Sequence, residues 1–303
     1  MSLFNTLVAS AIPLAPRVLI RKVSRRYIAG DTVADATERV AALNTAGFSA
    51  TVDVLGETVE SLAQADNTTR EYLKVLEAIA CDGLRANISV KPTALGLLLD
   101  QAHCERNLER LLDAAKKNAT FVRIDMEDAS CTQREIDLLL RLKSRGYGNV
   151  GLVLQAYLKR TDNDITPLLG TRENLRICKG IYVEDREHLV EGAWNDRGAI
   201  NPHFLCHVAR CFDGGTFVGV ATHDEELIEQ VISLASDRRI AKTAFEFQML
   251  LGVRENLRDR LLAEGYSVRI YVPYGKDWYG YSMRRIKENP SIAGHLLRAL
   301  LVR

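Results

Sequence analysis

Two adjacent arginines in a predicted helix near the C-terminus carry the strongest chemical signal in this chain. The β-branched run Ser267–Val272 predicts a strand, which ends at Pro273. In the helical pattern that follows, Tyr281, Arg284 and Arg285 lie at positions i, i+3 and i+4 and therefore share one face. Because guanidinium groups form paired hydrogen bonds with carboxylates and phosphates, these residues indicate a site for a small anion. A solvated basic face fits the same spacing, so both interpretations stay open on this stretch alone.

Polar side chains also stand at the ends of the other short apolar runs of the chain. A strand that is buried on both faces is normally apolar throughout, so a charge at its end needs a partner or a ligand. Internal ion pairs would explain any one of these groups, but the whole set together favours a binding site. The groups are Asp53 and Glu57, Lys91, Asp125, Gln155, Arg176 and Lys179, Thr222 and His223, and Glu246 and Gln248.

The elements that must position these groups alternate along the chain. Eight runs predict strands: Ser49–Leu55, Ala86–Lys91, Thr120–Asp125, Val150–Ala156, Leu175–Lys179, Thr216–Ala221, Thr243–Gln248 and Ser267–Val272. Helical patterns lie between them, including Thr69–Ala80, Gln101–Asn118, Thr132–Arg145, Asp185–Trp194, Glu225–Ser236 and Arg254–Glu264. Eight strand–helix units favour an α/β fold of the closed (β/α)8 TIM-barrel type, with the active site at the C-terminal ends of the strands. We expect residues 1–45 to form an N-terminal helical arm and residues 46–303 to form the barrel.

Composition and charge narrow the functional classes. The 303 residues are 47% apolar and carry a net charge of +1, which gives no reason to expect nucleic acid as a partner. No apolar run reaches the roughly 20 residues that a membrane-spanning helix needs. The six cysteines are scattered without a C-x-x-C pair, so we expect reduced thiols and a cytoplasmic setting.

Motifs for other cofactors are weak. The chain has no G-x-G-x-x-G after a predicted strand and no Walker loop, so a nucleotide cofactor would not be held in the Rossmann manner. His203, His207 and Cys211 lie at i, i+4 and i+8, which allows a metal site, but an ordinary helix with small apolar cysteines is the better interpretation. We therefore expect no metal.

Several of these segments, in this order, make the chain resemble proline dehydrogenases of the small, single-function bacterial kind. The resemblance covers about residues 49–290. The segments that carry it are Arg269–Gly275 with Tyr281–Asn289, Gln155–Arg160, Arg176–Tyr182, Ala221–His223 and Glu246–Gln248. Each segment is a moderate signal alone, and their order and spacing make the set specific. The chain departs from the usual pattern at Ile181 and Val183, where the family more often has Ala and Trp, and this small change puts the cofactor contacts in little doubt.

The resemblance implies a distorted (β/α)8 barrel that holds FAD without a covalent bond. It implies cofactor contacts by Gln155 and Arg176 near the flavin ring and by Lys179, Gly180, Ile181, Thr222 and His223 around the rest of the cofactor, with Met126 nearby. It implies a substrate carboxylate site of Lys91, Arg284 and Arg285, aromatic walls of Tyr271 and Tyr281, a catalytic pair of Asp125 and Arg176 beside Lys91, and a gate in which Glu57 pairs with Arg284. By the same resemblance, Tyr271 favours proline over hydroxyproline.

The resemblance further implies the activity and its partners. L-Proline would be oxidised to 1-pyrroline-5-carboxylate by hydride transfer to flavin N5, as the first step of proline catabolism to glutamate, and the electrons would pass to a quinone. A separate pyrroline-5-carboxylate dehydrogenase would consume the product. A quinone acceptor implies a peripheral contact with the inner face of the membrane. Leu296–Val302 is a short amphipathic candidate for that contact, and closure of the barrel bottom is the slightly preferred alternative.

Three rival functions stay open. A related cyclic amino acid such as hydroxyproline could replace proline, and the space around Tyr271, Tyr281 and Leu95 would decide between them. A non-flavin lyase could use Lys91 or Lys179 as a Schiff-base amine. A non-catalytic barrel could act as a binding subunit, but it would not need this set of charges at its strand ends.

Overall fold

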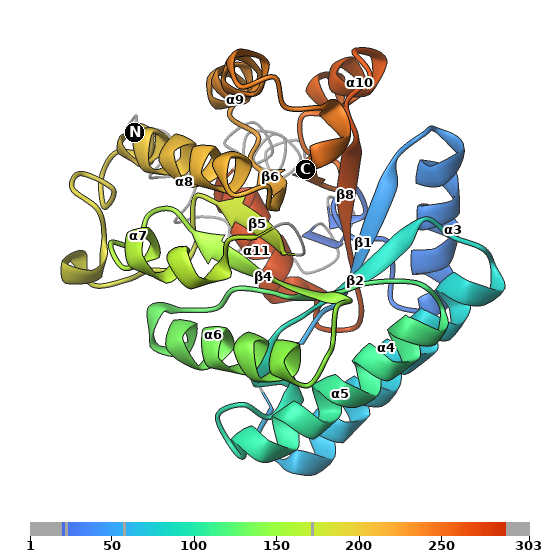
Figure 1. The fold of residues 1–303 in the computed structure, drawn as a ribbon. Coiled ribbons are helices and arrows are strands. Elements are labelled where there is room, and N and C mark those ends of the chain that lie inside the picture. Colours follow the sequence, from blue (N-terminus) through green and yellow to red (C-terminus); the bar gives the residue numbers. More distant parts are fainter. Residues whose placement is uncertain (1–19, 22–23, 57–58, 171–172, 289–303) are drawn as a thin grey trace, which may run out of the picture.

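Eight parallel strands form a closed barrel, in which each strand pairs with the next along the chain and the last pairs with the first (Figure 1). The computed structural model describes residues 20–21, 24–56, 59–170 and 173–288, without the side chains of 284–288. The strands are β1 (Ser49–Val54), β2 (Ala86–Val90), β3 (Val122–Ile124), β4 (Val150–Gln155), β5 (Asn174–Cys178), β6 (Phe217–Ala221), β7 (Phe245–Leu250) and β8 (Val268–Tyr274). Their bounds lie close to the predicted ones, and the predicted (β/α)8 class is confirmed.

The interior of the barrel is polar, and the apolar core lies between the strands and the helices. In β2, Ile88 and Val90 belong to the apolar core, whereas Asn87 and Ser89 form hydrogen bonds with side chains of other strands. This alternation follows the period of two that a strand imposes on its side chains. Barrels of this class usually fill their interior with bulky branched apolar residues. The departure marks the interior of this barrel as the place for a polar function.

Most of the helices surround the barrel on its outside, whereas α11 is drawn across the middle of the view (Figure 1). The longer ones are α3 (Val33–Thr45), α4 (Leu62–Cys81), α5 (Gln101–Lys117), α6 (Ala129–Ser144), α8 (Asn201–Asp213), α9 (Glu225–Asp237), α10 (Glu255–Ala263) and α11 (Trp278–Glu288). The shorter ones are η2 (Pro92–Leu95), α7 (Thr161–Asp164), η3 (Thr166–Leu168), η4 (Arg186–His188), η5 (Arg197–Ile200) and η6 (Lys242–Ala244). Ser61, Asp100, Asp128 and Asp224 each cap a helix that follows a strand, by accepting a hydrogen bond from a backbone N–H of the first turn. The caps therefore help to fix where the chain turns from each strand into its helix.

The predicted helix Asp185–Trp194 is wrong. Only the 3-10 turn η4 forms there, and the chain next to it makes an antiparallel bridge between Leu158 and Leu189. The backbone N–H of Val190 donates to Tyr157 O at 2.8 Å, and this pairing competes with the hydrogen bonds of a helix. Gly192 then adopts φ +78°, which ends any helical course. The long helix after β5 is α8 instead.

The first described helix lies against the barrel wall. Helix α3 packs on β1 and β8, and a capping box between Thr32 and Asp35 fixes its start. Helix α3 forms the last part of the expected arm of residues 1–45. Before it, the structure describes residues 20–21 and 24–32, of which Ile20, Arg21 and Ser24 are helical, and the boundary at residue 45 stays a prediction. Within the described ranges, no helix is both long enough and apolar enough to cross a membrane.

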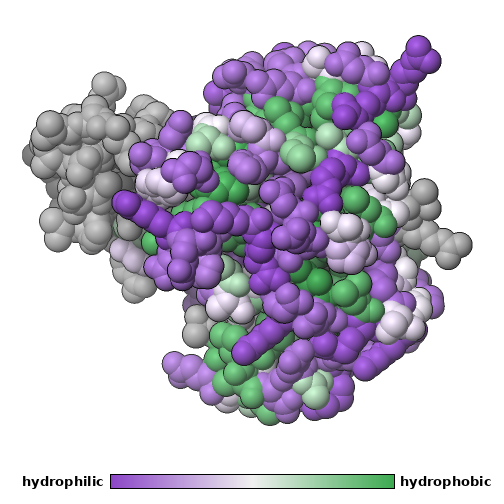
Figure 2. Space-filling view, turned by 60° about the vertical axis from the view of Figure 1, so that its left-hand side comes forward, coloured by the Kyte–Doolittle hydropathy of each residue, from purple (hydrophilic) through white to green (hydrophobic). Residues whose placement is uncertain are grey.

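The distribution of side chains on the surface agrees with an apolar core that the helices cover. Figure 2 shows a face on which hydrophilic residues predominate and hydrophobic residues form small areas between them. Apolar side chains of the strands, such as Ile88, Val122 and Phe247, are fully covered. The helices therefore bury the outer faces of these strands.

Candidate active site

Side chains from β2, β5 and β8 and from the end of β3 meet inside the barrel, towards the C-terminal ends of the strands. Asp125, directly after β3, accepts hydrogen bonds on Oδ2 from Ser89 Oγ at 3.0 Å and from the Tyr271 hydroxyl at 2.8 Å. Its Oδ1 lies 3.3 Å from a guanidinium nitrogen of Arg176. The same guanidinium lies over the Tyr271 ring, 5.5 Å from the ring centroid. The structure thus brings three predicted site residues, far apart in the sequence, into one buried network.

Burial and charge set the protonation of this network. Burial alone would raise the pKa of Asp125, but the positive charges of Arg176 and Lys91 and the hydrogen bonds from Tyr271 and Ser89 hold that pKa below its usual value. Burial and the negative charge of Asp125 raise the pKa of Tyr271 well above its usual range. At neutral pH, Asp125 is therefore an ionised acceptor and Tyr271 a neutral donor.

A second ion pair stands beside the network. The Nζ of Lys91, directly after β2, lies 3.4 and 3.5 Å from the two carboxylate oxygens of Asp53 in β1. Both side chains are largely buried. A buried ion pair gains little net stability after the cost of desolvation, so its retention here points to binding. The charge of Lys91 is close enough to lower the pKa of Asp125.

Arg176 is held from inside the barrel as well. Gln248 accepts a hydrogen bond from its Nε, and Gln248 Nε2 donates to Glu246 Oε1 at 2.6 Å. Because a carboxylate only accepts, Glu246 fixes the orientation of this amide. Arg269 Nε donates to the same oxygen at 2.6 Å. Gly219 on β6 leaves the space, since a Cβ there would lie 2.4 Å from Gln248 Nε2.

Gln155 presents an acceptor that no described residue uses. Its Nε2 donates to the backbone oxygen of Glu127 at 2.7 Å, which fixes the amide orientation. Its Oε1 is buried and has no hydrogen-bond partner among the residues that the structure describes. A buried polar atom without a partner is costly, so this oxygen is suited to a ligand that carries an N–H or O–H group.

The ends of β5 and β6 carry the next group of predicted cofactor residues. Lys179 Nζ lies 2.7 Å from Asp224 Oδ2, and Asp224 caps α9. Thr222 Oγ1 accepts a hydrogen bond from Asp224 N at 3.2 Å. The backbone N–H of Leu250 donates to Nε2 of His223 at 2.9 Å, which places the ring proton on Nδ1. These residues form one continuous edge of the barrel mouth.

The predicted backbone contact at Gly180 needs a glycine for two reasons. Its φ is +105°, and a Cβ there would lie 2.3 Å from the ring of Tyr157. Ile181 and Met126 are partly exposed at the same end of the barrel. The hydroxyl of Tyr182 donates to Met126 O at 3.4 Å and so joins the loops that follow β3 and β5.

Three of the remaining predicted residues, Tyr281, Arg284 and Arg285, belong to α11. Tyr281 is 8% exposed on this helix. Arg284 and Arg285 fall within α11, as predicted, but their side chains lie outside the described residues. Glu57, the predicted gate, also lies outside them. The roles of these three residues stay predictions.

Ser89, Asp53 and Gln248 take part in the site without an assigned role in the sequence prediction. Ser89 is two residues before Lys91, and the period of two in a strand would have placed it inside the barrel. Asp53 and Gln248 were noted only as polar residues of strands. Their partners come from distant strands, and local sequence carries no signal for that pairing.

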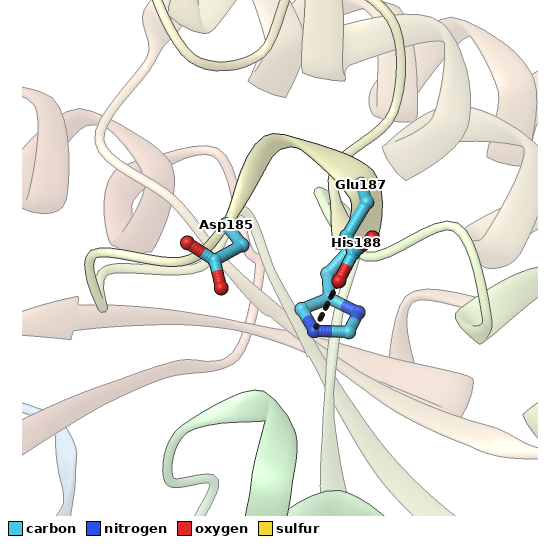
Figure 3. Close-up of side chains that lie close together, drawn as sticks. All are labelled: Asp185, Glu187 and His188. Atoms are coloured by element: carbon cyan, nitrogen blue, oxygen red, sulfur yellow. Dashed lines mark ion pairs between the residues drawn. The ribbon is translucent and has the colours of Figure 1, made fainter.

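Two groups of side chains have the composition of metal ligands but carry no metal assignment. Within the described ranges, Asp185, Glu187 and His188 hold their ligand atoms within 4.8 Å of one another, but all three are exposed (Figure 3). Exposed acidic groups of this kind are common without an ion, so the cluster does not indicate a site. In α8, His207 Nε2 pairs with Asp162 at 2.8 Å and Cys211 is buried in the apolar core. The helix expected for this segment forms as α8.

Comparison with known proteins agrees with this arrangement. The family profile described as proline dehydrogenase matches residues 36–298. Proline dehydrogenase 1 of Bacillus subtilis subsp. natto is 37% identical over 278 residues, which cover 92% of this chain and 90% of that protein. Proline dehydrogenase of Deinococcus radiodurans is 34% identical over 283 residues, with 92% and 90% covered.

A solved structure shows the same fold. Proline utilization A (PutA) from Bdellovibrio bacteriovorus, inactivated by N-propargylglycine, matches with a TM-score of 0.81 at 22% identity. The match covers 89% of this chain and 33% of the PutA chain, so this chain corresponds to one part of that longer protein. Its low identity bears on the fold alone, whereas the profile and the two bacterial relatives extend over most of the sequence. From these matches, the chain belongs to the proline dehydrogenase family.

Proposed function

We propose that this protein oxidises L-proline to 1-pyrroline-5-carboxylate with bound FAD, as the first step in the catabolism of proline to glutamate. Membership of the proline dehydrogenase family gives the reaction class. The observation that carries the proposal is the buried network of Asp125, Arg176 and Tyr271 beside Lys91 at the strand ends. A barrel without a ligand would gain little from this arrangement, because each of these charges must be desolvated.

The substrate carboxylate is assigned to Lys91 with Arg284 and Arg285. Proline is small, so charge-assisted hydrogen bonds to its carboxylate must supply much of its binding energy. Lys91 is held by Asp53 at one end of the barrel, and α11 carries both arginines past the same end. Tyr281, buried on α11, and Tyr271 are assigned to the walls of the proline pocket. Apolar and aromatic walls would exclude water from the charged groups.

The cofactor site fits FAD on the chemistry of its donor and acceptor groups. A flavin ring carries an N–H that needs an acceptor, and Gln155 Oε1 is buried with no partner among the described residues. His223 offers a ring N–H, and Lys179 offers a positive charge suited to phosphate. Thr222, Gly180, Ile181 and Met126 complete the proposed contacts at the same end of the barrel. Bound FAD would supply a hydride acceptor at its N5 atom.

The residues of the chain would then perform three tasks. Arg176 holds a positive charge where negative charge develops during the reaction, and Asp125 and Gln248 fix its guanidinium. Lys91 orients the substrate through its carboxylate, which brings the reacting carbon to its acceptor. Tyr271, held by Asp125, presents its phenol to the ring of the substrate and would crowd a ring hydroxyl. The substrate nitrogen must be neutral before hydride loss.

Two observations weigh against the rival lyase. A Schiff-base lysine must be deprotonated to act as a nucleophile. Lys91 lies 3.4 Å from Asp53, and Lys179 lies 2.7 Å from Asp224. Both amino groups are therefore engaged by a carboxylate, which occupies the nitrogen that a Schiff-base lysine would present to its substrate.

We propose a quinone as the electron acceptor and a separate pyrroline-5-carboxylate dehydrogenase as the enzyme that consumes the product. A peripheral contact with the inner face of the membrane would give access to a membrane quinone. Leu296–Val302, the candidate segment, lies outside the described residues. Reduction of a water-soluble quinone analogue by protein and proline would support this acceptor, and oxygen as the only working acceptor would contradict it.

The direct test is the visible spectrum of the purified protein, recorded before and after anaerobic addition of L-proline. We expect flavin absorption that bleaches with proline and persists with hydroxyproline. Flavin that stays oxidised with proline would refute the substrate. A colourless protein that cannot take up added FAD would refute the cofactor.

A further inference from the structure

The side chain of Tyr72, from the helical layer, interrupts the backbone hydrogen bonds between strands β1 and β2. Strands β1 and β2 pair from Ala50↔Ala86 to Val52↔Ile88, and the same register would next join Val54 N–H to Ser89 C=O. Instead, Val54 N–H donates to the hydroxyl of Tyr72 at 3.2 Å, and this hydroxyl lies 2.8 Å from Ser89 O. One phenol oxygen therefore stands between the two strands where their backbones would otherwise meet.

Tyr72 reaches this position from α4, which packs on β1 and β2. It is only 1% exposed. Burial and the charge of Asp53 raise its pKa well above the usual range, so the hydroxyl stays protonated at any physiological pH. A neutral phenol can accept from one group and donate to another, which is what a bridge between an N–H and a C=O requires.

The same hydroxyl contacts the ion pair at the substrate end of the barrel. Asp53 Oδ1 lies 3.2 Å from the Tyr72 oxygen and 3.4 Å from Lys91 Nζ. Asp53 is almost fully buried, so its carboxylate depends on such contacts for its position. Lys91 follows Ser89 by two residues. The Tyr72 hydroxyl can therefore influence the position of Lys91 by two routes: through its contact with Asp53, and through its hydrogen bond to Ser89 in β2.

We propose that Tyr72 is a positioning residue for the substrate carboxylate, acting through Asp53 on Lys91. The inference rests on the proposed function, because that function assigns Lys91 to the carboxylate of proline. Without the hydroxyl, Val54 N–H and Ser89 C=O are free to close into an ordinary ladder bond, and Asp53 Oδ1 loses the hydroxyl whose single proton it shares with Ser89 O. A long lysine side chain has many rotamers. If Asp53 moves, Lys91 is no longer held in one of them and its ammonium group occupies several positions.

The test compares Tyr72→Phe with Tyr274→Phe. Tyr274 is a matched control, because its phenol is buried to the same degree on the neighbouring strand β8 but its hydroxyl donates to Glu71 at 3.1 Å. For Tyr72→Phe we expect the KM for L-proline to rise about tenfold, the order of one lost buried hydrogen bond, with kcat within about twofold of wild type. FAD content and flavin spectrum should be unchanged. Tyr274→Phe should keep the wild-type KM.

A double-mutant cycle with Asp53→Asn tests whether Tyr72 acts through Asp53. If it does, Tyr72→Phe adds little to the KM of Asp53→Asn, whereas fully additive effects overturn the proposal. Equal KM values for the two Tyr→Phe variants overturn it as well. KM does not depend on the fraction of protein that is folded, so a lower yield of either variant leaves the comparison valid.

The outcome separates this inference from the proposed function. If proline bleaches the wild-type flavin and Tyr72→Phe behaves like its control, the function stands and Tyr72 has a structural role only. If proline does not reduce the wild-type flavin, the assignment of Lys91 to proline fails first. Binding of cyclopentanecarboxylate, which has the carboxylate but no ring nitrogen, then shows whether the Lys91 end of the barrel still takes a carboxylate.

Discussion

Asp125 shows how one side chain can organise a buried site. It accepts hydrogen bonds from Ser89 and Tyr271 and pairs with Arg176. Ionised carboxylates are the strongest acceptors among the side chains, and several donors can share the two oxygens. The charge of this one carboxylate therefore helps to position the Tyr271 phenol and the Arg176 guanidinium.

The lowered pKa of Asp125 predicts a stability loss in acid. A carboxyl whose pKa is lower in the folded state adds stability above its unfolded pKa of about 4, and loses it as the pH falls through the folded value. At neutral pH we expect Asp125→Asn to lower the free energy of unfolding by about 3–5 kcal/mol, because Arg176 keeps its buried charge but loses its carboxylate partner. The gap to wild type should shrink below about pH 4.

Urea unfolding at a series of pH values measures this gap. Asp237→Asn is the control, since Asp237 is exposed at the end of α9. A gap that stays constant from neutral pH to strong acid would show that Asp125 is not ionised in the folded protein.

At the scale of elements, the contact between β6 and β7 depends on a glycine, which leaves room for a side chain of the neighbouring strand. Gly219 on β6 faces Gln248 on β7, whose amide is fixed between Glu246 and Arg176. The amide cannot turn away without breaking one of these bonds. A methyl group added at Gly219 would therefore displace the Gln248 amide, and with it the guanidinium of Arg176 on β5.

Gly219→Ala should disturb the site through this contact. The new Cβ would lie 2.4 Å from Gln248 Nε2 and 2.7 Å from its Cδ, so the amide must move. We expect a loss of about 1–3 kcal/mol in unfolding free energy and slower reduction of the flavin by proline. Stopped-flow reduction and urea unfolding measure the two effects. Gly148→Ala, where a Cβ meets nothing within 4 Å, should show neither.

Element boundaries were predictable where local patterns decide them. The short β-branched and apolar runs predicted all eight strands, and the resemblance to proline dehydrogenases predicted that Asp125 lies beside Lys91 and Arg176. Asp185–Trp194 failed because pairing with Leu158, a contact between distant segments, overrides its helical pattern. Tyr72 was missed because it lies in a helix on the outside of the wall, where a tyrosine normally indicates apolar packing.

At the scale of the whole molecule, ligand binding and folding should be linked. The proposed cofactor residues come from β4, β5 and β6 and from the loops after β3, β5 and β6, which are assembled only in the folded barrel. A ligand that binds only the folded state adds stability by mass action, about 2.7 kcal/mol at a free concentration of 100 times Kd. Bound FAD would thus stabilise the folded barrel in addition to taking part in the reaction.

Removal of FAD should lower the melting temperature by several degrees. For a chain of this size, each kcal/mol corresponds to about 2–4 °C, and added FAD should restore the loss in proportion to the logarithm of its concentration. Differential scanning calorimetry of the protein with and without FAD measures the shift. A melting temperature that does not respond to excess FAD would argue against a cofactor site in this barrel.

The polar interior of the barrel also bears on how stability varies with temperature. Unfolding exposes the apolar core, which raises the heat capacity, but it also exposes buried polar groups such as Arg123, Asn87 and Glu246, which lowers it. The net heat-capacity change per residue is then smaller than for a barrel filled with aliphatic side chains. Its stability curve is accordingly flatter, and the protein keeps a similar margin against heat and cold over a broader range.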